Sequence, residues 1–543
     1  MPERRWVPVA AAMLVLVAGC TGERSVDPGS ADPAPTAPTL TAPAPTTVAP
    51  RQSPAESLGL VPGWGPDRAT LDRAARLTGA MSLPELAGQV IVARYDGTAA
   101  PVDLVRDLQL GGVIVFGDNV ASGDQIAASN EELRRGVERE WPLFIGVDQE
   151  GGIVARATEG VTAFPAFMSA GAAADTEVTR AAMHGLGSEL ADLGFSVDFA
   201  PTADVTTGPR DPTIGSRSVG SDAAMVVEQV EAAVTGFRDA GVIPVIKHFP
   251  GHGSVPADSH EELPVQTRTR AELDESDLVP FAAAAQAEIP AVMVGHIDVR
   301  AVDPGVPSSL SRKLVTGVLR DDLGFDGLVV TDALDMAGVA DGRTSAQSAV
   351  QALRAGSDVL LMPPDPRAAR QGVIDAVRAG DLDRRRLRQA AARQVALLLH
   401  QAAGGDPGPV DAPAASRALS AAAVTVASGP CEGRLVGRAV RPVGSSEAVV
   451  AFSAAAERAG LVIDPGSSET VAFTGFGGAP VSGAVAVATD TPYVLGPSRA
   501  PVKIATYGLT PGAMDALVAV LLGEAPAPGR LPVPVEGVER RGC

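Results

Sequence analysis

The sequence lacks the excess of basic residues that a nucleic-acid-binding protein needs. It holds 44 Lys and Arg residues against 64 Asp and Glu residues, which gives a formal net charge of -20. Binding to phosphates requires a basic face, and no basic stripe occurs along the chain. We therefore expect no nucleic-acid partner.

The chain also lacks a convincing membrane span. The apolar run from Val7 to Ala18 follows two arginines and is too short and too close to the terminus to cross a bilayer. It is typical of a secretory signal, so we place a lipoprotein signal peptide over residues 1–20. The segment that ends at Cys20 resembles a bacterial lipobox, which implies cleavage before Cys20 and a lipid on its thiol. We expect an extracytoplasmic protein, lipid-anchored to the bacterial cell membrane; an ordinary cleaved signal with an incidental Cys20 is the alternative.

Cysteine is scarce, with three residues in the whole chain. Apart from Cys20, only Cys431 and Cys543 remain, and both would lie in a compartment that tolerates disulfides. A bond between them would close a loop of roughly a hundred residues, worth about 4 to 5 kcal/mol in the chain-entropy description. Their separation in space cannot be deduced from the sequence, so the pairing stays open.

Length and composition indicate more than one domain. The chain has 543 residues, 45% of them hydrophobic, which is enough for two substantial cores. A stretch rich in Pro, Ala and Thr over residues 21–60 cannot bury enough apolar surface to fold, and we expect a disordered tether there. A catalytic domain over residues 61–402 follows. A Gly- and Pro-rich linker over residues 403–413 then leads to a small domain over residues 414–543.

Short apolar runs alternate with Ala-rich helical stretches through the larger domain. Apolar strands separated by helices predict a parallel sheet covered on both faces, and eight such units indicate a (β/α)8 TIM-type barrel. An open doubly wound sheet is the alternative. The eight expected strands cover residues 89–93, 112–116, 143–148, 195–200, 243–249, 291–296, 327–332 and 358–362.

The region after the linker predicts a small C-terminal α/β sandwich domain. Its expected strands are residues 448–452, 470–473, 484–488 and 502–506, and residues 512–522 are expected to form a helix. This region carries no acidic catalytic motif.

Three of the six histidines fall within residues 247–260. Pro250 and Gly251 prevent a helix there, so the segment is a loop. Within it, the carboxylate of Asp258 can orient one nitrogen of His260, which suits a general acid/base near neutral pH. A metal site and a purely structural loop are the alternatives. No third ligand set stands out, so we expect no metal and no cofactor.

The run Lys-His-Phe-Pro-Gly-His-Gly at residues 247–253, followed by Asp-Ser-His at 258–260, resembles the signature of family 3 glycoside hydrolases of the β-N-acetylglucosaminidase type. Further segments of the same resemblance lie at residues 147–152, 200–205, 214–218 and 330–336. Together they span about residues 75–400. The resemblance implies a barrel fold and a glycosidase activity.

The resemblance also implies the reacting groups. Asp332 matches the family's nucleophile, at the end of a strand that can aim its carboxylate. His260, oriented by Asp258, matches the acid/base and would replace the second carboxylate of the usual retaining scheme. Asp335, three residues after Asp332, is expected to face a helix surface and is not a candidate.

Other family positions would hold the N-acetylglucosamine unit. Asp204 and His296 are weaker candidates, because buried hydrogen bonds at strand ends explain them equally well. Glu150 lies beside these positions without an assignable role. The expected substrate-binding residues are Asp148, Arg156, Arg217, Lys247 and His248.

These residues predict a β-N-acetylhexosaminidase that acts as a retaining exo-β-N-acetylglucosaminidase on cell-wall, peptidoglycan-derived fragments. The expected partner is a small glycan or muropeptide. A family 3 β-glucosidase or β-xylosidase is the nearest alternative, and a non-catalytic glycan-binding lipoprotein is an alternative of another class. The sequence leaves open the length of the substrate, transfer to phosphate instead of water, the oligomeric state and the role of the second domain.

Overall fold

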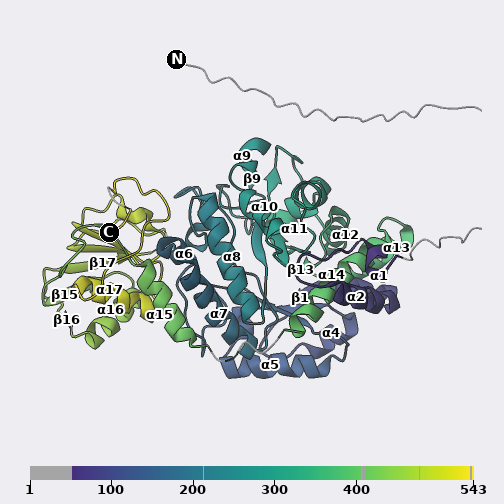
Figure 1. Ribbon diagram of the computed structural model, residues 1–543, viewed down its shortest axis with the longest axis horizontal. Coiled ribbons are helices and arrows are strands. Elements are labelled where there is room, and N and C mark those ends of the chain that lie inside the picture. The colour runs from purple at the N-terminus through teal and green to yellow at the C-terminus, as the bar shows by residue number, and fades with distance from the viewer. Residues whose placement is uncertain are drawn as a thin grey trace, which may run out of the picture. The chain divides into compact units, whose positions relative to one another are not determined.

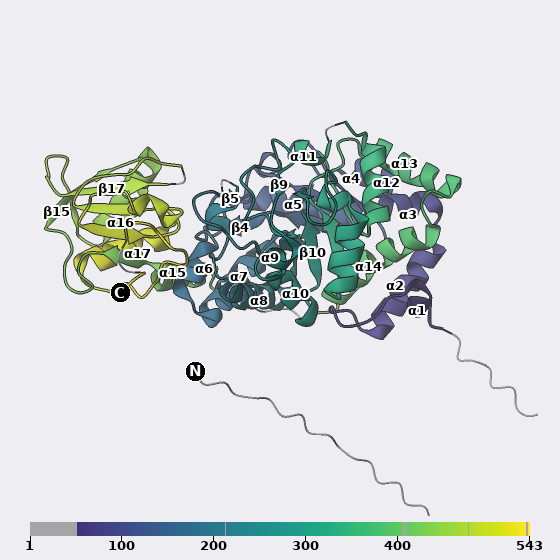
Figure 2. The ribbon, with the colours of Figure 1, turned by 90° about the horizontal axis from the view of Figure 1, so that it is seen from above.

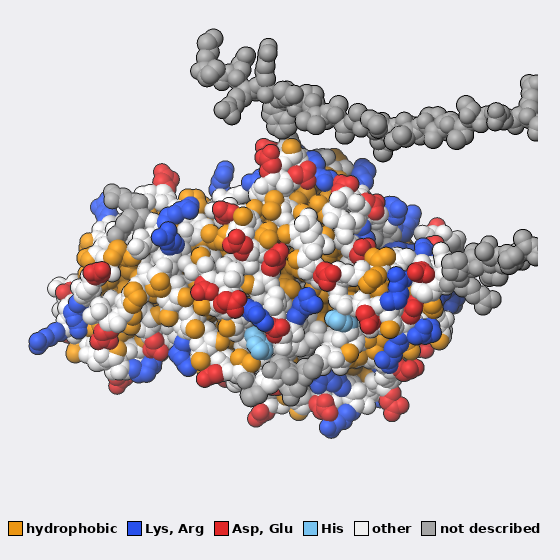
Figure 3. All heavy atoms as spheres, in the orientation of Figure 1, with side chains coloured by type: hydrophobic (Ala, Val, Ile, Leu, Met, Phe, Trp, Pro, Cys, Tyr) orange, Lys and Arg blue, Asp and Glu red, His pale blue; other side chains and the backbone are white. Residues whose placement is uncertain are grey.

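The computed structural model describes residues 52–543, except 212, 341, 405–407, 409, 476, 539 and 540. The expected signal peptide, the lipidation site Cys20 and most of the expected tether lie outside the described residues. Among the residues that are described, no helix is long and apolar enough to cross a bilayer. On the face drawn in Figure 3, acidic and basic side chains are interspersed.

Parallel strands form the centre of the first part of the chain (Figures 1 and 2). A six-stranded sheet has the order β13-β1-β2-β3-β6-β7, and a three-stranded sheet has the order β12-β10-β8. The strands are β1 (Ile91–Arg94), β2 (Gly112–Val115), β3 (Phe144–Val147), β6 (Val197–Asp198), β7 (Ile243–Pro244), β8 (Ile246–Phe249), β10 (Ala291–Val294), β12 (Leu328–Thr331) and β13 (Leu360–Leu361).

Each of these strands lies within or overlaps one of the eight expected strand segments, which confirms the α/β class. Isolated parallel bridges join Val330 to Val359 and Thr202 to Lys247, and so link strands of the two sheets. β7 and β8 are separated by one residue and pair with different sheets. The parallel sheet is therefore curled, with the strand segment 243–249 shared between its two portions.

Helices separate successive strands and cover them with apolar faces. The buried side of α8, for example, carries Val226, Val230, Ala233 and Phe237, at the spacing of one helix face. The helices are α2 (Arg68–Ala80), α3 (Leu83–Gln89), α4 (Val102–Leu108), α5 (Gly123–Gly136), α6 (Met168–Ala173), α7 (Thr176–Asp192), α8 (Ala223–Asp239), α9 (Arg270–Asp274), α10 (Val279–Gln286), the π-helical η4 (Lys313–Asp322), α11 (Ala337–Ala340), α12 (Ser345–Ala355), α13 (Pro366–Ala379) and α14 (Arg384–Ala402).

A helix lies within the range expected for the tether. Helix α1 (Pro54–Leu58) has a reciprocal cap, in which Ser53 accepts from the N–H of Glu56 and Glu56 accepts from the N–H of Ser53. Leu58 and Leu60 are buried in the main core. The boundary drawn at residue 60 is therefore corrected, because a capping pair and two leucines give this short segment both a helix start and an anchor.

A second sheet follows α14, with the order β14-β19-β18-β17-β15-β16. β14 runs antiparallel to β19, and the other pairs are parallel. Its elements are α15 (Ala412–Ala423), β14 (Thr425–Ser428), β15 (Ala439–Val443), α16 (Ser446–Arg458), β16 (Val462–Ile463), β17 (Thr470–Thr474), β18 (Val485–Ala488), η5 (Pro492–Leu495), β19 (Val502–Ala505) and α17 (Pro511–Leu522).

One strand expected in this region is wrong. Residues 448–452 lie inside α16, which starts where the Ser445 side chain accepts from the N–H of Ala448. The apolar run continues into Ser-Ala-Ala-Ala-Glu-Arg, so it belongs to a helix, and a five-residue apolar run alone does not separate the two structures. The expected strands at β17, β18 and β19 and the expected helix at α17 are confirmed.

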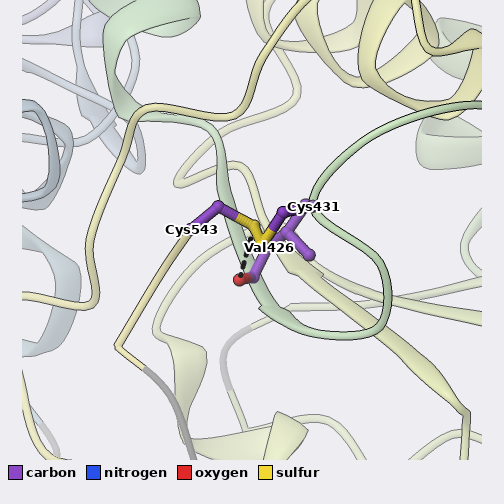
Figure 4. Close-up of a disulfide and its surroundings, with 3 residues drawn as sticks. All are labelled: Val426, Cys431 and Cys543. Carbon is purple, nitrogen blue, oxygen red and sulfur yellow. Dashed lines mark hydrogen bonds between the residues drawn. A yellow bond between two sulfur atoms is a disulfide. The ribbon is translucent and has the colours of Figure 1, made fainter.

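Cys431 and Cys543 form a disulfide, with their Cα atoms 5.6 Å apart (Figure 4). The two cysteines are 112 residues apart in the sequence, so the bond ties the end of the chain to the loop after β14. The sequence left this pairing open, and the structure resolves it.

Side chains of both parts pack together between α6 and the second sheet. α15 lies beside α6 in both ribbon views (Figures 1 and 2). Backbone hydrogen bonds join Ala166 to Tyr507 and Arg530 to Ala172, each 2.9 Å long. Met168 and Ala172 of α6 share an apolar cluster with residues of the second sheet.

A buried carboxylate ties together the amino ends of the last strands of the curled sheet. Asp358 precedes β13, is fully buried, and accepts from Arg320 at 2.6 Å, Arg386 at 3.0 Å and Arg393 at 3.2 Å. The same guanidinium groups donate to the carbonyl oxygens of residues 325, 326, 327, 356 and 357. Burial raises the pKa of Asp358, but the three arginines lower it by more. The pKa therefore lies below its ordinary value, and the carboxylate stays ionised.

Asp358→Ala is expected to lower the free energy of unfolding by about 3 to 5 kcal/mol, because three buried guanidinium groups lose their common counter-ion. Asp321→Ala, at an exposed carboxylate of η4, serves as the control and is expected to change stability by less than about 0.5 kcal/mol. Urea unfolding at pH 7 measures both. Equal, small losses would contradict the role given to Asp358.

Candidate active site

The candidate site residues follow the carboxyl ends of the parallel strands. Asp148 comes directly after β3, Lys247 and His248 lie in β8, and Asp332 comes directly after β12. Because parallel strands present their carboxyl ends on the same side of a sheet, these residues gather there. The curled sheet thus brings together side chains that are almost 200 residues apart in the sequence.

Three segments meet at the carboxylate of Glu150, in β4 (Gln149–Gly151). Arg217, in the short helix η2 (Gly215–Arg217), donates to both Glu150 oxygens at 2.9 Å. The ammonium group of Lys247 lies 2.6 Å from Glu150 and 2.7 Å from Asp148. Two carboxylates and two cations therefore form one compact ion-pair cluster.

Electrostatics keep three groups of this cluster charged, namely Glu150, Arg217 and Lys247. Burial raises the pKa of Glu150, but Arg217 and Lys247 outweigh that effect and leave the pKa well below its usual range. Burial lowers the pKa of Arg217 and of Lys247, whereas the neighbouring carboxylates raise both above their ordinary values. These three groups can therefore present fixed charges to a polar ligand without first losing or gaining protons.

A second network fixes the histidines that follow β8. Asp204 is fully buried and accepts from the Nδ1 atom of His248 at 2.6 Å and from the backbone N–H of His252 at 2.6 Å. The Nε2 atom of His248 then lies 3.4 Å from Arg217. Asp204 thus positions the histidine and is itself out of reach of a ligand.

Asp332 and the acid/base candidate belong to the same neighbourhood. The Nδ1 atom of His260 lies 2.7 Å from Asp258, and the side chain of His260 is 64% exposed. The backbone N–H of Gly338, shortly after Asp332, donates to the carbonyl of Ser259 at 3.1 Å. The loop that carries the Asp258–His260 pair is therefore tied to the segment after the nucleophile candidate.

The pKa of Asp332 lies below its ordinary value. Burial raises it, but His296, His248, the N–H of Ala333 and His260 together lower it by more. The N–H of Ala333 donates to the Asp332 carboxylate at 2.8 Å. An ionised, oriented carboxylate near an exposed imidazole can supply a nucleophile and a general acid/base.

His296 has a supporting position. It is fully buried, and its two ring nitrogens lie 2.7 Å from the hydroxyl of Ser309 and 2.9 Å from the carbonyl of Ala333. Both nitrogens are occupied, so His296 supports the backbone beside Asp332 and has no nitrogen left for a sugar.

Arg156 follows the hairpin of β4 and β5 (Val154–Ala155). Its guanidinium lies over the ring of Phe116 at 5.2 Å, and its Nε atom is buried without a hydrogen-bond partner among the described residues. The backbone N–H of Arg156 donates to the side chain of Gln149 at 2.8 Å. This hydrogen bond anchors Arg156 to the hairpin that also carries Glu150.

Sequence reasoning left Glu150 without a role, although the structure makes it the centre of the ion-pair cluster. Asp148 and Glu150 are two residues apart, and this spacing places side chains on one side of an extended chain. This spacing in the sequence could have predicted that Glu150 lies beside Asp148. The hydroxyl of Ser259 lies 3.0 Å from the Nε2 atom of His252, and this contact could not be predicted from the sequence because it depends on how the loop folds.

The described residues contain no group of three or more His, Cys, Asp or Glu side chains arranged to hold a metal ion. Asp148, Glu150, Arg217 and Lys247 are instead paired with one another.

Comparison with known proteins decides the family. The model of the glycosyl hydrolase family 3 N terminal domain matches residues 82–397, which is more than half of the chain. The chain belongs to glycosyl hydrolase family 3. All the candidate site residues from Asp148 to Asp332 fall inside the matched region.

Relatives named beta-hexosaminidase match about half of this family 3 chain. Beta-hexosaminidase A of Pseudoalteromonas piscicida is 37% identical over 281 residues, 48% of this chain and 47% of that protein. A beta-hexosaminidase of Alkalilimnicola ehrlichii is 40% identical over 266 residues, 48% of this chain and 75% of that protein. The matched region thus spans about half of the first relative and three quarters of the second.

A solved structure extends the likeness to the second sheet. The family 3 beta-N-acetylglucosaminidase of Paenibacillus sp. str. FPU-7 superimposes with a TM-score of 0.76 at 29% sequence identity. The match covers 84% of this chain and 100% of that chain. The arrangement of both sheets therefore has a counterpart in a solved member of family 3.

One further carboxyl lies beneath the ion-pair cluster. Asp198 of β6 is fully buried; its Oδ1 atom accepts from the N–H of Gln149 at 2.9 Å, and its Oδ2 atom has no partner among the described residues. Burial raises its pKa well above the usual value, only partly opposed by Gln149 and Lys247. The folded protein thus favours the protonated form of Asp198.

Asp198→Asn is expected to gain stability relative to the wild type as the pH rises. Because the pKa of Asp198 is raised in the folded state, the wild type loses stability as the pH rises above the unfolded-state pKa, which is near 4. This loss continues until the carboxyl of the folded protein ionises, whereas Asn does not titrate. Urea unfolding at pH 4, 6 and 8 measures the free energy of unfolding of the variant and of the wild type. The difference between the two should grow by more than about 1 kcal/mol from pH 4 to pH 8. Asp192→Asn, at an exposed carboxyl at the end of α7, is the matched control. A difference that does not change with pH would refute the buried, protonated state.

Proposed function

We propose that the protein is a retaining exo-β-N-acetylglucosaminidase that removes terminal β-linked N-acetylglucosamine from small glycans. The single observation that carries this proposal is the pairing of an ionised strand-end carboxylate, Asp332, with the exposed imidazole of His260 on a loop tied to the same segment. The names of the relatives point to the same sugar.

The reaction has two steps. In the first, the Asp332 carboxylate attacks the anomeric carbon, the glycosidic bond breaks, and the protonated imidazole of His260 gives its proton to the leaving oxygen. The sugar is then held as an ester of Asp332. In the second step, neutral His260 takes a proton from water, and the water oxygen attacks the anomeric carbon and frees Asp332. Asp258 holds Nδ1 throughout, which leaves Nε2 to carry the proton.

The ion-pair cluster supplies the sugar-binding wall. Arg217, Lys247 and Asp148 offer charged donors and acceptors, which make strong hydrogen bonds to hydroxyl groups. Their mutual ion pairs hold them in place before a sugar arrives, so little ordering is left to the binding step. His248 and Arg156 extend the same wall through their contacts with Arg217 and Phe116.

We further propose that the curled sheet is one closed (β/α)8 barrel and that residues 414–543 form a separate small α/β domain. Two bridges support closure. The bridge between Val330 and Val359 joins β12 to the residue before β13, and both of these strands are sheet edges; the bridge between Thr202 and Lys247 joins the segment after β6 to β8. A barrel places every strand's carboxyl end around one mouth, which suits a site assembled from many segments.

The cell-wall substrate and the lipid anchor on Cys20 are also proposals, supported by the sequence of the first twenty residues. A lipid on Cys20 would keep the enzyme outside the cytoplasm, next to peptidoglycan-derived fragments. Two alternatives remain for experiment: a β-glucosidase or β-xylosidase, and a glycan-binding protein without activity. The oriented Asp258–His260 pair favours the acetamido-sugar enzyme over both.

The experiment uses the chain without residues 1–20, offered an aryl β-N-acetylglucosaminide and an aryl β-glucoside. The wild type should prefer the first substrate, Asp332→Asn should lose at least about a thousandfold in kcat/KM, and His260→Ala about a hundredfold or more. Asp335→Asn is the matched control for Asp332→Asn, since Asp335 lies three residues away, and it should stay within about threefold of the wild type.

Turnover by Asp332→Asn that equals that of the wild type would overturn the nucleophile assignment. Preference for the β-glucoside would favour the first alternative, and binding without turnover the second. Adding phosphate and assaying for sugar 1-phosphate tells whether water or phosphate is the acceptor.

A further inference from the structure

A cavity of about 610 Å³ lies at the amino ends of β1, β2 and β3. Its lining residues precede these strands in the chain: Gln89 comes before β1, Gln109 before β2 and Trp141 before β3. The three strands are parallel, so their amino ends share one edge of the sheet. Asp148 and Asp332 follow carboxyl ends of strands, at the opposite edge. This cavity is therefore separate from the candidate active site.

Trp141 gives the cavity a half-buried aromatic wall. Of the two tryptophans in the described part of the chain, Trp64 is buried in the main core, whereas Trp141 lines the cavity. The indole N–H of Trp141 donates to the side-chain oxygen of Gln89 at 3.2 Å. The side-chain nitrogen of Gln89 in turn donates to Gln394 at 2.7 Å, and both glutamines are buried. These hydrogen bonds hold the indole ring in one orientation.

Charged groups of both signs surround this ring. The guanidinium of Arg139 lies over Trp141, 5.6 Å from the ring centroid, and donates to the carbonyl of Leu110 at 2.9 Å. A planar guanidinium beside an aromatic ring combines flat surface with fixed hydrogen-bond donors. The carboxylates of Glu85 and Glu138 line the same cavity. A ligand there meets an aromatic surface together with hydrogen-bond donors and acceptors.

A second cavity, of about 790 Å³, continues the first along α4 and α5, which lie side by side (Figure 1). Arg106, Arg135 and Gly136 line both cavities, so the two form one elongated groove. Arg106 pairs with Asp103 at 3.4 Å and Arg135 with Glu131 at 2.8 Å, both on exposed helix surfaces. Such exposed ion pairs are weak, so both guanidinium groups can turn to a ligand. We call the two cavities together the Trp141 groove.

The lining of the Trp141 groove fits a neutral saccharide chain. The apolar C–H face of a sugar ring packs on an aromatic ring, and its hydroxyl groups bond to carboxylate and guanidinium groups. Carboxylates outnumber guanidinium groups along the groove, which opposes the binding of a polyanion. The elongated shape suits a chain of several units better than one compact molecule. A saccharide is also the class of molecule on which a glycoside hydrolase acts.

We propose that the Trp141 groove is a second carbohydrate-binding site, which holds a neutral strand of β-linked N-acetylated sugars with one ring stacked on Trp141. The kind of sugar rests on the proposed function, whereas the groove does not depend on the chemistry of Asp332. Because the groove lies at the edge of the sheet opposite the active site, a bound strand does not block catalysis. The site keeps the enzyme on its polymer between cleavages.

The test measures how the chain without residues 1–20 sediments with insoluble chitin, a neutral polymer of β-linked N-acetylglucosamine. An exo-acting active site meets only chain ends, so binding along the polymer reports the groove. The wild type should bind, and Trp141→Ala should bind about tenfold more weakly or worse, because buried aromatic anchors dominate binding energies. Val450→Ala, at an exposed apolar side chain of α16, is the matched control and should bind like the wild type. Both variants should keep kcat/KM for the aryl β-N-acetylglucosaminide within about twofold of the wild type.

A second variant keeps the proposal open to refutation if Trp141→Ala does not fold. Arg106→Ala combined with Arg135→Ala changes two exposed side chains and should weaken binding to chitin about fivefold or more, because two charged donors are lost. A wild type that does not bind chitin, or that binds polyglutamate equally well, would overturn the proposal. Unchanged binding by the folded variants, or a loss of activity that matches the loss of binding, would overturn it too. Binding to chitin without turnover of the aryl substrate would instead overturn the proposed function alone.

Discussion

The site depends on one buried carboxylate, that of Glu150. Lys247 comes from β8, Arg217 from the loop after β6, and Glu150 from the hairpin after β3, so a single group joins three strand ends. Burying these charges is unfavourable unless each is paired, and the cluster pairs all of them together with Asp148. A displacement of any one segment would leave a buried charge unpaired, which makes the relative positions of the three strand ends strongly specified.

The same network sets the electrical environment of the chemistry. Cations on one side of the site pair with Glu150 and Asp148, while His296, His248 and His260 lie near Asp332 and lower its pKa. Burial lowers the pKa of His252 to about 4 and also holds that of His296 below its ordinary value.

Much of this arrangement could be predicted from the sequence. Apolar runs interrupted by helices indicated a parallel sheet, and the positions of Asp148, Lys247 and Asp332 at the ends of such runs indicated a common edge. The Asp258–His260 pair could be predicted because both partners lie in one short loop.

Other features depend on tertiary contacts that no local pattern encodes. Residues 448–452 form part of a helix because the next residues extend it to Arg458 and because Ser445 caps the start, whereas the apolar run alone fits a strand equally well. The expected end of the tether at residue 60 was wrong because Leu58 and Leu60 are buried in the main core, most of whose residues lie far along the sequence. The disulfide between Cys431 and Cys543 required the distance between two loops, and the central place of Glu150 required knowledge of its partners 67 and 97 residues further along the chain.

The central claim is that Asp332 becomes covalently bound to the sugar. The most direct measurement is peptide mass spectrometry after reaction with a fluorinated N-acetylglucosaminide, which forms the ester faster than water removes it. We predict the mass of one sugar residue on the peptide that contains Asp332, assigned by fragmentation to Asp332 and not to Asp335. Release of the leaving group without any adduct, or an adduct on another carboxylate, would contradict the account.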